Sequence, residues 1–138
     1  PDISEFPRFA LDRSGAVVNG NCYWISLEDI ADEDLAYLML AVANSNLGVR
    51  FYDETCGNKL YSGKRRWITQ YVQRMPLPNP ATDEARRVIA LARLVTHGED
   101  VTAELVAELD DAVTAAFAAS YAKRQVAPSE ELEEATLF

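Results

Sequence analysis

Three adjacent basic residues, Lys64, Arg65 and Arg66, form the group in this chain with the clearest capacity for chemistry. They lie between Tyr61 and Trp67, in a chain whose formal net charge is −9. Lysine and arginine donate hydrogen bonds to phosphates, and arginine can also read guanine with two hydrogen bonds in a major groove. The cluster therefore indicates an anionic partner such as DNA, although a buried acidic neighbour or a plain solvated charge run would also explain it.

The other reactive side chains lack the partners that catalysis requires. The carboxylates of Asp53 and Glu54 are adjacent, so they point apart in either regular structure and are interpreted as solvated surface. Cys56 has no base and no oxyanion site that can be assigned to it. The single histidine, His97, precedes Gly98, which predicts a cation at the C-terminal end of a helix.

The sequence holds no motif for binding a nucleotide cofactor or a metal ion. Neither form of Gly-rich phosphate loop is present, and with one histidine there is no HExxH pair and no Cys/His set. An Asn-Pro-Pro-aromatic tetrapeptide is also absent. We therefore expect no catalytic, cofactor-binding or metal-binding residue in this chain.

The bulk composition indicates one folded domain in a reducing compartment. Its 138 residues, 49% of them hydrophobic, are enough for one core. The longest apolar run, residues 36–43, is far shorter than the roughly 20 residues of a membrane span. The two cysteines, Cys22 and Cys56, are not spaced as a metal site or a disulfide framework, which favours the cytoplasm. The chain begins at Pro1 without a signal sequence, so we expect a piece of a longer protein.

Charge and proline content divide the chain into three parts. Residues 1–76 carry 8 Lys/Arg and 10 Asp/Glu, whereas residues 77–138 carry 5 and 12. Pro76, Pro78 and Pro80 end whichever element precedes them. We predict an α+β region over residues 1–80, a helical hairpin over residues 81–122, and an acidic, disordered tail over residues 123–138.

The first region begins with short β-type runs and continues into a helix. Strands are expected at residues 8–11, 16–18 and 22–25, with a hairpin turn at the Asn-Gly step between the last two. Ser26 with Asp29 resembles a capping box. Asp32 is a second N-cap candidate, for a core-facing helix that is expected to end near residues 46–48.

The rest of the chain is predicted to be a loop followed by helices. Residues 49–67 lose helical period and contain several glycines, which favours a loop or hairpin, and residues 68–75 fit a strand or a short helix. Thr82 is an N-cap for a helix that ends at Gly98, and a second helix begins near Thr102. The predicted fold class is α+β: a small antiparallel sheet packed on a helix, followed by a C-terminal helical hairpin.

Four segments in order give the chain a family pattern. They are Asn21-Cys22-Tyr23-Trp24-Ile25, the helix that closes on Ala43-Asn44-Ser45, the basic loop, and Tyr71-Val72-Gln73-Arg74-Met75-Pro76-Leu77-Pro78. This pattern resembles the C-terminal specificity region of TaqI-type adenine-N6-specific DNA methyltransferases of restriction-modification systems. The resemblance covers residues 7–120, and the stretch from Leu109 to Phe117 is similar to the helix that often closes such proteins.

The resemblance implies that this chain is a target-recognition region working with an N-terminal methyltransferase domain of the same polypeptide. In the family that domain binds S-adenosylmethionine and carries an Asn/Asp-Pro-Pro-Tyr/Phe motif, against which the flipped adenine stacks. No position of this chain matches the motif. The resemblance therefore implies that the other domain extrudes the adenine, while this chain binds the double-stranded DNA around the target. The expected DNA contacts are Lys64, Arg65, Arg66, Arg50, Lys59, Tyr61, and Asn58 as a candidate base reader.

A second interpretation makes the chain a non-catalytic protein-interaction module. Its acidic helical hairpin would then bind a protein partner, and the basic loop would dock on an acidic surface of the parent protein. The two interpretations predict different partners for the same chain, duplex DNA or another protein.

Overall fold

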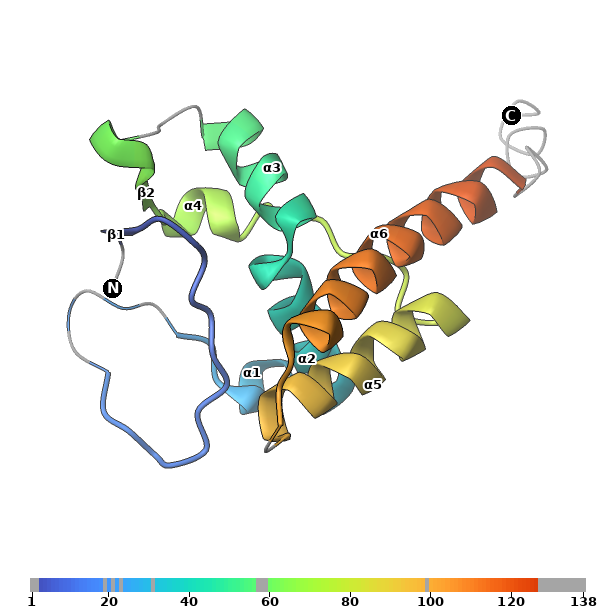
Figure 1. Cartoon of the computed structure of the whole chain (residues 1–138), viewed down its shortest axis with the longest axis horizontal. Helices are drawn as coiled ribbons and strands as arrows, with labels where there is room; N and C mark the ends of the chain where they lie inside the picture. The colour runs from blue at the N-terminus through green and yellow to red at the C-terminus, as the bar shows by residue number, and fades with distance from the viewer. Residues whose placement is uncertain are drawn as a thin grey trace, which may run out of the picture.

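The computed structural model describes residues 3–18, 20, 22, 24–30, 32–56, 60–98 and 100–126. Its elements are β1 (Ile3–Ser4), α1 (Leu27–Ile30), α2 (Glu33–Asn44), α3 (Asn46–Cys56), the single 3-10 turn η1 (Tyr61–Gly63), β2 (Arg65–Arg66), α4 (Thr69–Val72), α5 (Asp83–His97) and α6 (Ala103–Val126). Figure 1 shows α2, α5 and the first half of α6 packed together, while α3, α4 and the two strands group at the other end of the molecule. A small antiparallel sheet with a C-terminal helical region makes the fold α+β, as predicted.

The sheet joins two segments that lie far apart in the sequence. β1 pairs antiparallel with β2, so that Ile3 faces Arg66 and Ser4 faces Arg65. The indole Nε1 of Trp67 donates a hydrogen bond to Ser4 Oγ over 2.9 Å, which fastens the strand pair at its end. The sheet is therefore built from non-local contacts and not from a local hairpin.

The strands predicted from the sequence between residues 8 and 25 are wrong. The described residues of those runs form no regular structure, and most of them are exposed. One reason is a local turn, in which the Asp12 carboxylate accepts hydrogen bonds from the backbone N–H groups of Ser14 and Ala16. The bond from Ala16 uses a donor that a strand over residues 16–18 would need. Asn19, Asn21 and Tyr23 lie outside the described residues.

Local hydrogen bonds begin the first two helices where the sequence predicts. The Ser26 N–H donates to Asp29 Oδ2, and the Asp29 N–H donates to Ser26 Oγ, which is the reciprocal capping arrangement. At the start of α2 the Asp32 carboxylate accepts from the N–H groups of Asp34 and Leu35. An N-cap of this kind stabilises a helix by about 1 kcal/mol.

A single residue, Ser45, separates α2 from α3. Ser45 Oγ donates to the Val42 carbonyl over 2.8 Å and accepts from the Gly48 N–H over 3.0 Å. The two helices approach so closely that a Cβ on Gly48 would lie 2.2 Å from the Val42 oxygen. Because this serine corner starts a second helix, the loop predicted from residue 49 is wrong as far as Cys56.

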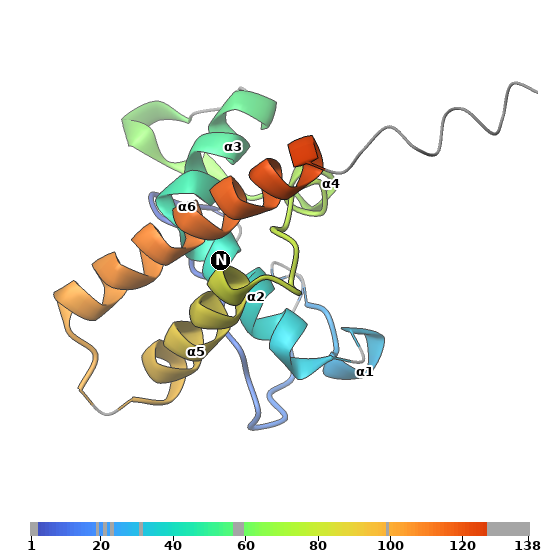
Figure 2. The same cartoon turned by 90° about the vertical axis from the view of Figure 1, so that its right-hand side faces the viewer.

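The hydrophobic core lies between α2, α5 and α6. Figure 2 shows α5 and α6 side by side, joined by a short connection. Thr82 Oγ1 accepts from the Ala85 N–H at the start of α5, and Gly98 follows its end, as predicted. The buried residues of the core are Tyr37, Leu38, Ala41, Val42, Ala85, Val88, Ile89, Leu91, Ala92, Ala112, Val113 and Ala116.

The remaining segments close the fold around this core. His97 ends α5, and its Nε2 shares a hydrogen bond of 2.5 Å with the Tyr37 hydroxyl of α2. Residues 68–75 contain the short helix α4, which settles the choice between strand and helix. α6 continues past Tyr121 to Val126, and residues 127–138 lie outside the described part. None of the helices in the described part of the chain combines the length and the hydrophobicity of a membrane span.

Candidate nucleic-acid interface

The basic cluster is divided between the two faces of an extended segment. Successive side chains of a strand point to opposite faces, so residues 64 and 66 share one face and residues 65 and 67 the other. Arg65 is partly buried and Trp67 is 6% exposed, which makes theirs the inner face. Lys64 and Arg66 are exposed. Only alternate members of the cluster therefore face solvent.

On the inner face, Arg65 is held between α3 and the N-terminal segment. Its Nε donates to Asp53 Oδ1 over 2.6 Å, and its Nη2 donates to Asp53 Oδ2 over 2.8 Å. Its Nη1 donates to the Glu5 carbonyl over 2.6 Å. The hydrogen bond from the guanidinium to the Asp53 carboxylate raises the pKa of Arg65 above its usual range. The interpretation of Asp53 as solvated surface is therefore wrong, and for Arg65 the alternative of an acidic neighbour is confirmed.

Tyr52 and Trp67 form the packed support of the inner face. Their ring centroids are 4.6 Å apart, and Phe9 packs edge-on against Trp67 at 5.7 Å. The Tyr52 hydroxyl donates to the Arg66 carbonyl over 2.5 Å and accepts from the Ile68 N–H over 2.9 Å. Burial of the ring raises the pKa of Tyr52 to about 12. One phenol from α3 therefore binds the backbone on both sides of Trp67.

A tight turn leads the chain into the cluster. The Leu60 N–H donates to the Lys64 carbonyl over 2.8 Å and closes the turn. Inside it, Ser62 has φ of 69° and Gly63 has φ of 76°, both in the left-handed region. Glycine adopts this region readily, whereas for serine it costs roughly 1–2 kcal/mol. The turn fixes the direction in which Lys64 leaves the body of the protein.

The other predicted contacts are placed only in part. Arg50 is exposed on α3. It precedes Asp53 by three residues, so the two side chains leave neighbouring positions on the helix surface. Asn58 and Lys59 lie outside the described residues, and only the backbone of Tyr61 is described. The structure therefore brings Lys64, Arg66 and Arg50 to neighbouring elements, and it turns Arg65 toward Asp53.

Ion pairs occupy several cations elsewhere in the fold. The pairs join Arg13 to Glu33, Arg86 to Asp83, Arg87 to Glu108 and Arg93 to Asp34. Within the described ranges, the cations without an ion pair are Arg8, Arg50, Lys64, Arg74, Lys123 and Arg124. Lys64 and Arg50 thus belong to a limited set whose charge is not already neutralised by a neighbour.

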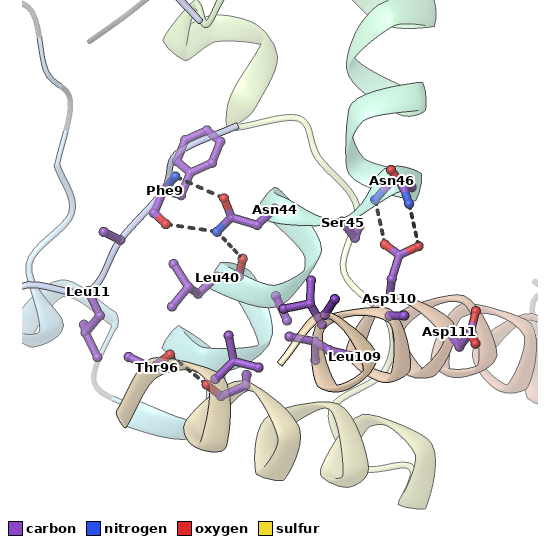
Figure 3. A pocket seen from close by; sticks show the side chains of 17 residues that line it. Phe9, Leu11, Leu40, Asn44, Ser45, Asn46, Thr96, Leu109, Asp110 and Asp111 are labelled. Carbon is purple, nitrogen blue, oxygen red and sulfur yellow. Dashed lines mark hydrogen bonds between the residues drawn. The ribbon is translucent and has the colours of Figure 1, made fainter. Parts of the chain in front are cut away.

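Hydrogen bonds at the corner between α2 and α3 join these helices to the N-terminal segment and to α6 (Figure 3). Asn44 Oδ1 accepts from the Phe9 N–H over 3.1 Å, and Asn44 Nδ2 donates to the Phe9 carbonyl over 3.0 Å. The backbone N–H and Nδ2 of Asn46 donate to the two oxygens of Asp110, over 2.7 and 2.9 Å. At this corner Asn44 therefore connects α2 to the N-terminal segment, and Asn46 connects α3 to α6.

A cavity of about 810 Å³ opens beside this corner (Figure 3). Its lining comes mainly from aliphatic side chains of α2, α5 and α6, with Phe9 and Leu11 on the N-terminal side. Asp110 and Asp111 are its carboxylates, and Asp110 is already bound to Asn46. Among the residues that the structure places, no group of three or more His, Cys, Asp or Glu could hold a metal ion. The cavity thus offers neither a metal site nor a nucleophile paired with a base.

No protein-family model matches the chain. It is similar to the Type II methyltransferase M.BanIII of Aneurinibacillus aneurinilyticus, with 38% identity over 93 residues. The match covers 67% of this chain, and it spans only 16% of the length of that relative. Two thirds of the chain is therefore related to a region of a Type II methyltransferase, which confirms the methyltransferase part of the resemblance.

Proposed function

We propose that this chain is the DNA target-recognition region of an adenine-N6-specific DNA methyltransferase. The observation that carries the proposal is the outer face of the cluster: Lys64 and Arg66 are exposed side by side beyond a tight turn, above a packed aromatic support. Side chains held in this way can bind phosphates without first ordering a loop. The similarity to a region of a Type II methyltransferase supports the choice of DNA as the anion.

The proposed DNA contacts come from β2 with the turn before it, from α3, and from the segment between them. Lys64 and Arg66 form the centre of the interface, and Arg50 is a further exposed cation on α3, the helix that the inner face of the segment contacts. Lys59, Tyr61 and the candidate base reader Asn58 belong to the segment between α3 and β2. In this arrangement the chain grips the duplex while another domain of the same polypeptide extrudes and methylates the adenine, a step that costs a few kcal/mol of unstacking.

S-adenosylmethionine is the cofactor that such an activity requires, and the residues described here do not fit it. The cavity beside the α2–α3 corner has mainly aliphatic walls. Of its two carboxylates, Asp110 already accepts two hydrogen bonds from Asn46, and Asp111 is exposed to solvent. We therefore assign the cofactor to the rest of the parent protein and no step of the reaction to this chain.

The test is to remove the outer cations in the full-length parent protein. Changing Lys64 and Arg66 to Ala should weaken binding to duplex DNA and lower the salt slope of log K by about 0.9 for each phosphate that is no longer neutralised. The matched control changes Lys123 and Arg124 to Ala, since both are also exposed but lie at the end of α6. Unchanged DNA binding and methylation in the first variant would refute the assigned surface.

A further inference from the structure

The inner-face arginine of the cluster has a different environment from its neighbours. Arg65 directs three N–H groups at protein acceptors, two at the Asp53 carboxylate and one at the Glu5 carbonyl. The side chains of Arg65 and Asp53 are 13% and 19% exposed. Both oxygens of the carboxylate are engaged, which is the bidentate geometry that suits a guanidinium and that lysine cannot reproduce.

This geometry leaves Arg65 with little to offer a phosphate. An approaching phosphate would have to displace the Asp53 carboxylate, and the released carboxylate would then repel the phosphate. The pair as a whole carries no net charge, so it adds little attraction at a distance. Lys64 and Arg66, by contrast, are exposed on the other face of the same segment.

The pair sits where three segments meet. Through Arg65, β2 is bound to α3 at Asp53 and to the residue after β1 at Glu5. The Tyr52 hydroxyl donates a hydrogen bond to the Arg66 carbonyl, and the Trp67 indole donates one to Ser4. Arg65, Arg66 and Trp67 are therefore each hydrogen-bonded to a neighbouring segment. The orientation of the outer face follows from these inner contacts, because side chains of an extended segment alternate.

On the basis of the proposed function, we propose that Arg65 is a positioning residue: it does not contact DNA, and its pairing with Asp53 orients the face that presents Lys64 and Arg66 to the phosphates. The proposal divides three adjacent basic residues into one that sets geometry and two that bind. It also makes Asp53, an acidic residue inside a basic region, a requirement for DNA binding.

The decisive experiment reverses the pair. Arg65→Asp, Asp53→Arg and the double variant are compared with wild type by urea unfolding of this chain and by duplex binding of the full-length parent over a range of salt. Each single change should weaken DNA binding by about tenfold or more, because it leaves two like charges facing each other. The double variant has the wild-type net charge and restores the ion pair but not the hydrogen bond to the Glu5 carbonyl, so it should be clearly more stable and bind DNA more tightly than either single variant, with the wild-type salt slope.

A conservative variant covers the case in which a reversed pair does not fold. Arg65→Lys keeps the positive charge but removes the bidentate pairing with Asp53. It should therefore weaken DNA binding several-fold with an unchanged salt slope. Arg87→Ala is the control, since Arg87 forms an exposed ion pair with Glu108, and it should change affinity by less than about twofold.

Each outcome has one meaning. A double variant that regains stability but stays weak in DNA binding, with a salt slope lower by about one phosphate, would show that Arg65 meets a phosphate and would overturn the proposal. Wild-type affinity and slope in Arg65→Lys would overturn it as well. If the wild-type parent itself binds no DNA, the proposed function fails. In that case recovery of stability in the double variant would show only that the pair stabilises the fold.

Discussion

Replacing Tyr52 by Phe removes one buried oxygen and leaves the packing of the ring intact. In the wild type this oxygen donates to the Arg66 carbonyl and accepts from the Ile68 N–H, and the side chain is 1% exposed. A hydrogen bond contributes about 1 kcal/mol net, and more when its loss leaves a buried partner unsatisfied. We therefore expect Tyr52→Phe to lower the free energy of unfolding by about 2 kcal/mol.

Urea unfolding followed by circular dichroism measures this change directly. Tyr71→Phe is the matched control, because Tyr71 packs edge-on against Tyr52 and its hydroxyl has no hydrogen bond among the residues that the structure describes. It should change the free energy of unfolding by less than about 0.5 kcal/mol. A Tyr52→Phe variant as stable as this control would refute the claim that the phenol holds the backbone around Trp67.

The same phenol gives the stability a dependence on alkaline pH. Its pKa is raised from 10.0 to about 12 in the folded state, so folding favours the protonated form. The resulting stabilisation is fully present below pH 10 and is lost as the pH rises through 12. By pH 11 the loss is about 1.4 kcal/mol, and Tyr52→Phe does not share it. The stability gap between wild type and variant should therefore narrow by that amount between pH 8 and pH 11, and a constant gap would contradict the assignment.

Further variants test the turn and the corner. Gly63→Ala should cost about 1 kcal/mol in urea unfolding, because alanine resists a φ of 76° even though its Cβ would meet no atom within 4 Å, and a stability equal to wild type would contradict the left-handed turn. Asp110→Asn should cost about 1 kcal/mol, because Asn46 at the start of α3 loses a charged acceptor. Asp111→Asn, at the exposed neighbouring position, should stay within about 0.5 kcal/mol, and equal effects of the two aspartate changes would contradict the capping role.

The parts of the fold that the sequence predicts are those decided by local hydrogen bonds. The side chains of Asp32 and Thr82 accept hydrogen bonds from N–H groups two or three residues further along the chain. Gly98 follows the last residue of the helix that Thr82 begins. Their positions follow from helix geometry alone. That α2 is a helix facing the core was also predictable, because its apolar residues recur within a single element.

The parts that could not be predicted depend on contacts between distant segments. Ser4 and Trp67 are 63 residues apart in the sequence, and no periodicity links them. The division of the basic cluster depends on Asp53, whose partner is chosen by the packing of α3 against β2. The corner at Ser45 was missed because a helix end followed by polar residues is more often a loop than the start of a second helix.

The charge arrangement limits how the proposed interface can bind. If Lys64, Arg66, Arg50 and Lys59 each meet one phosphate, the salt slope contributed by this chain is about −3.6, whereas a protein with six to ten phosphate contacts has a slope of about −5 to −9. The chain alone would then bind weakly at physiological salt. Its net charge of −9 repels a duplex that approaches from other directions, so the proposed attractive contacts are limited to the outer face of the extended segment at residues 64–67 and the exposed Arg50 of α3. Low affinity combined with one permitted orientation suits a region that sets register, while the rest of the parent protein supplies the remaining binding energy.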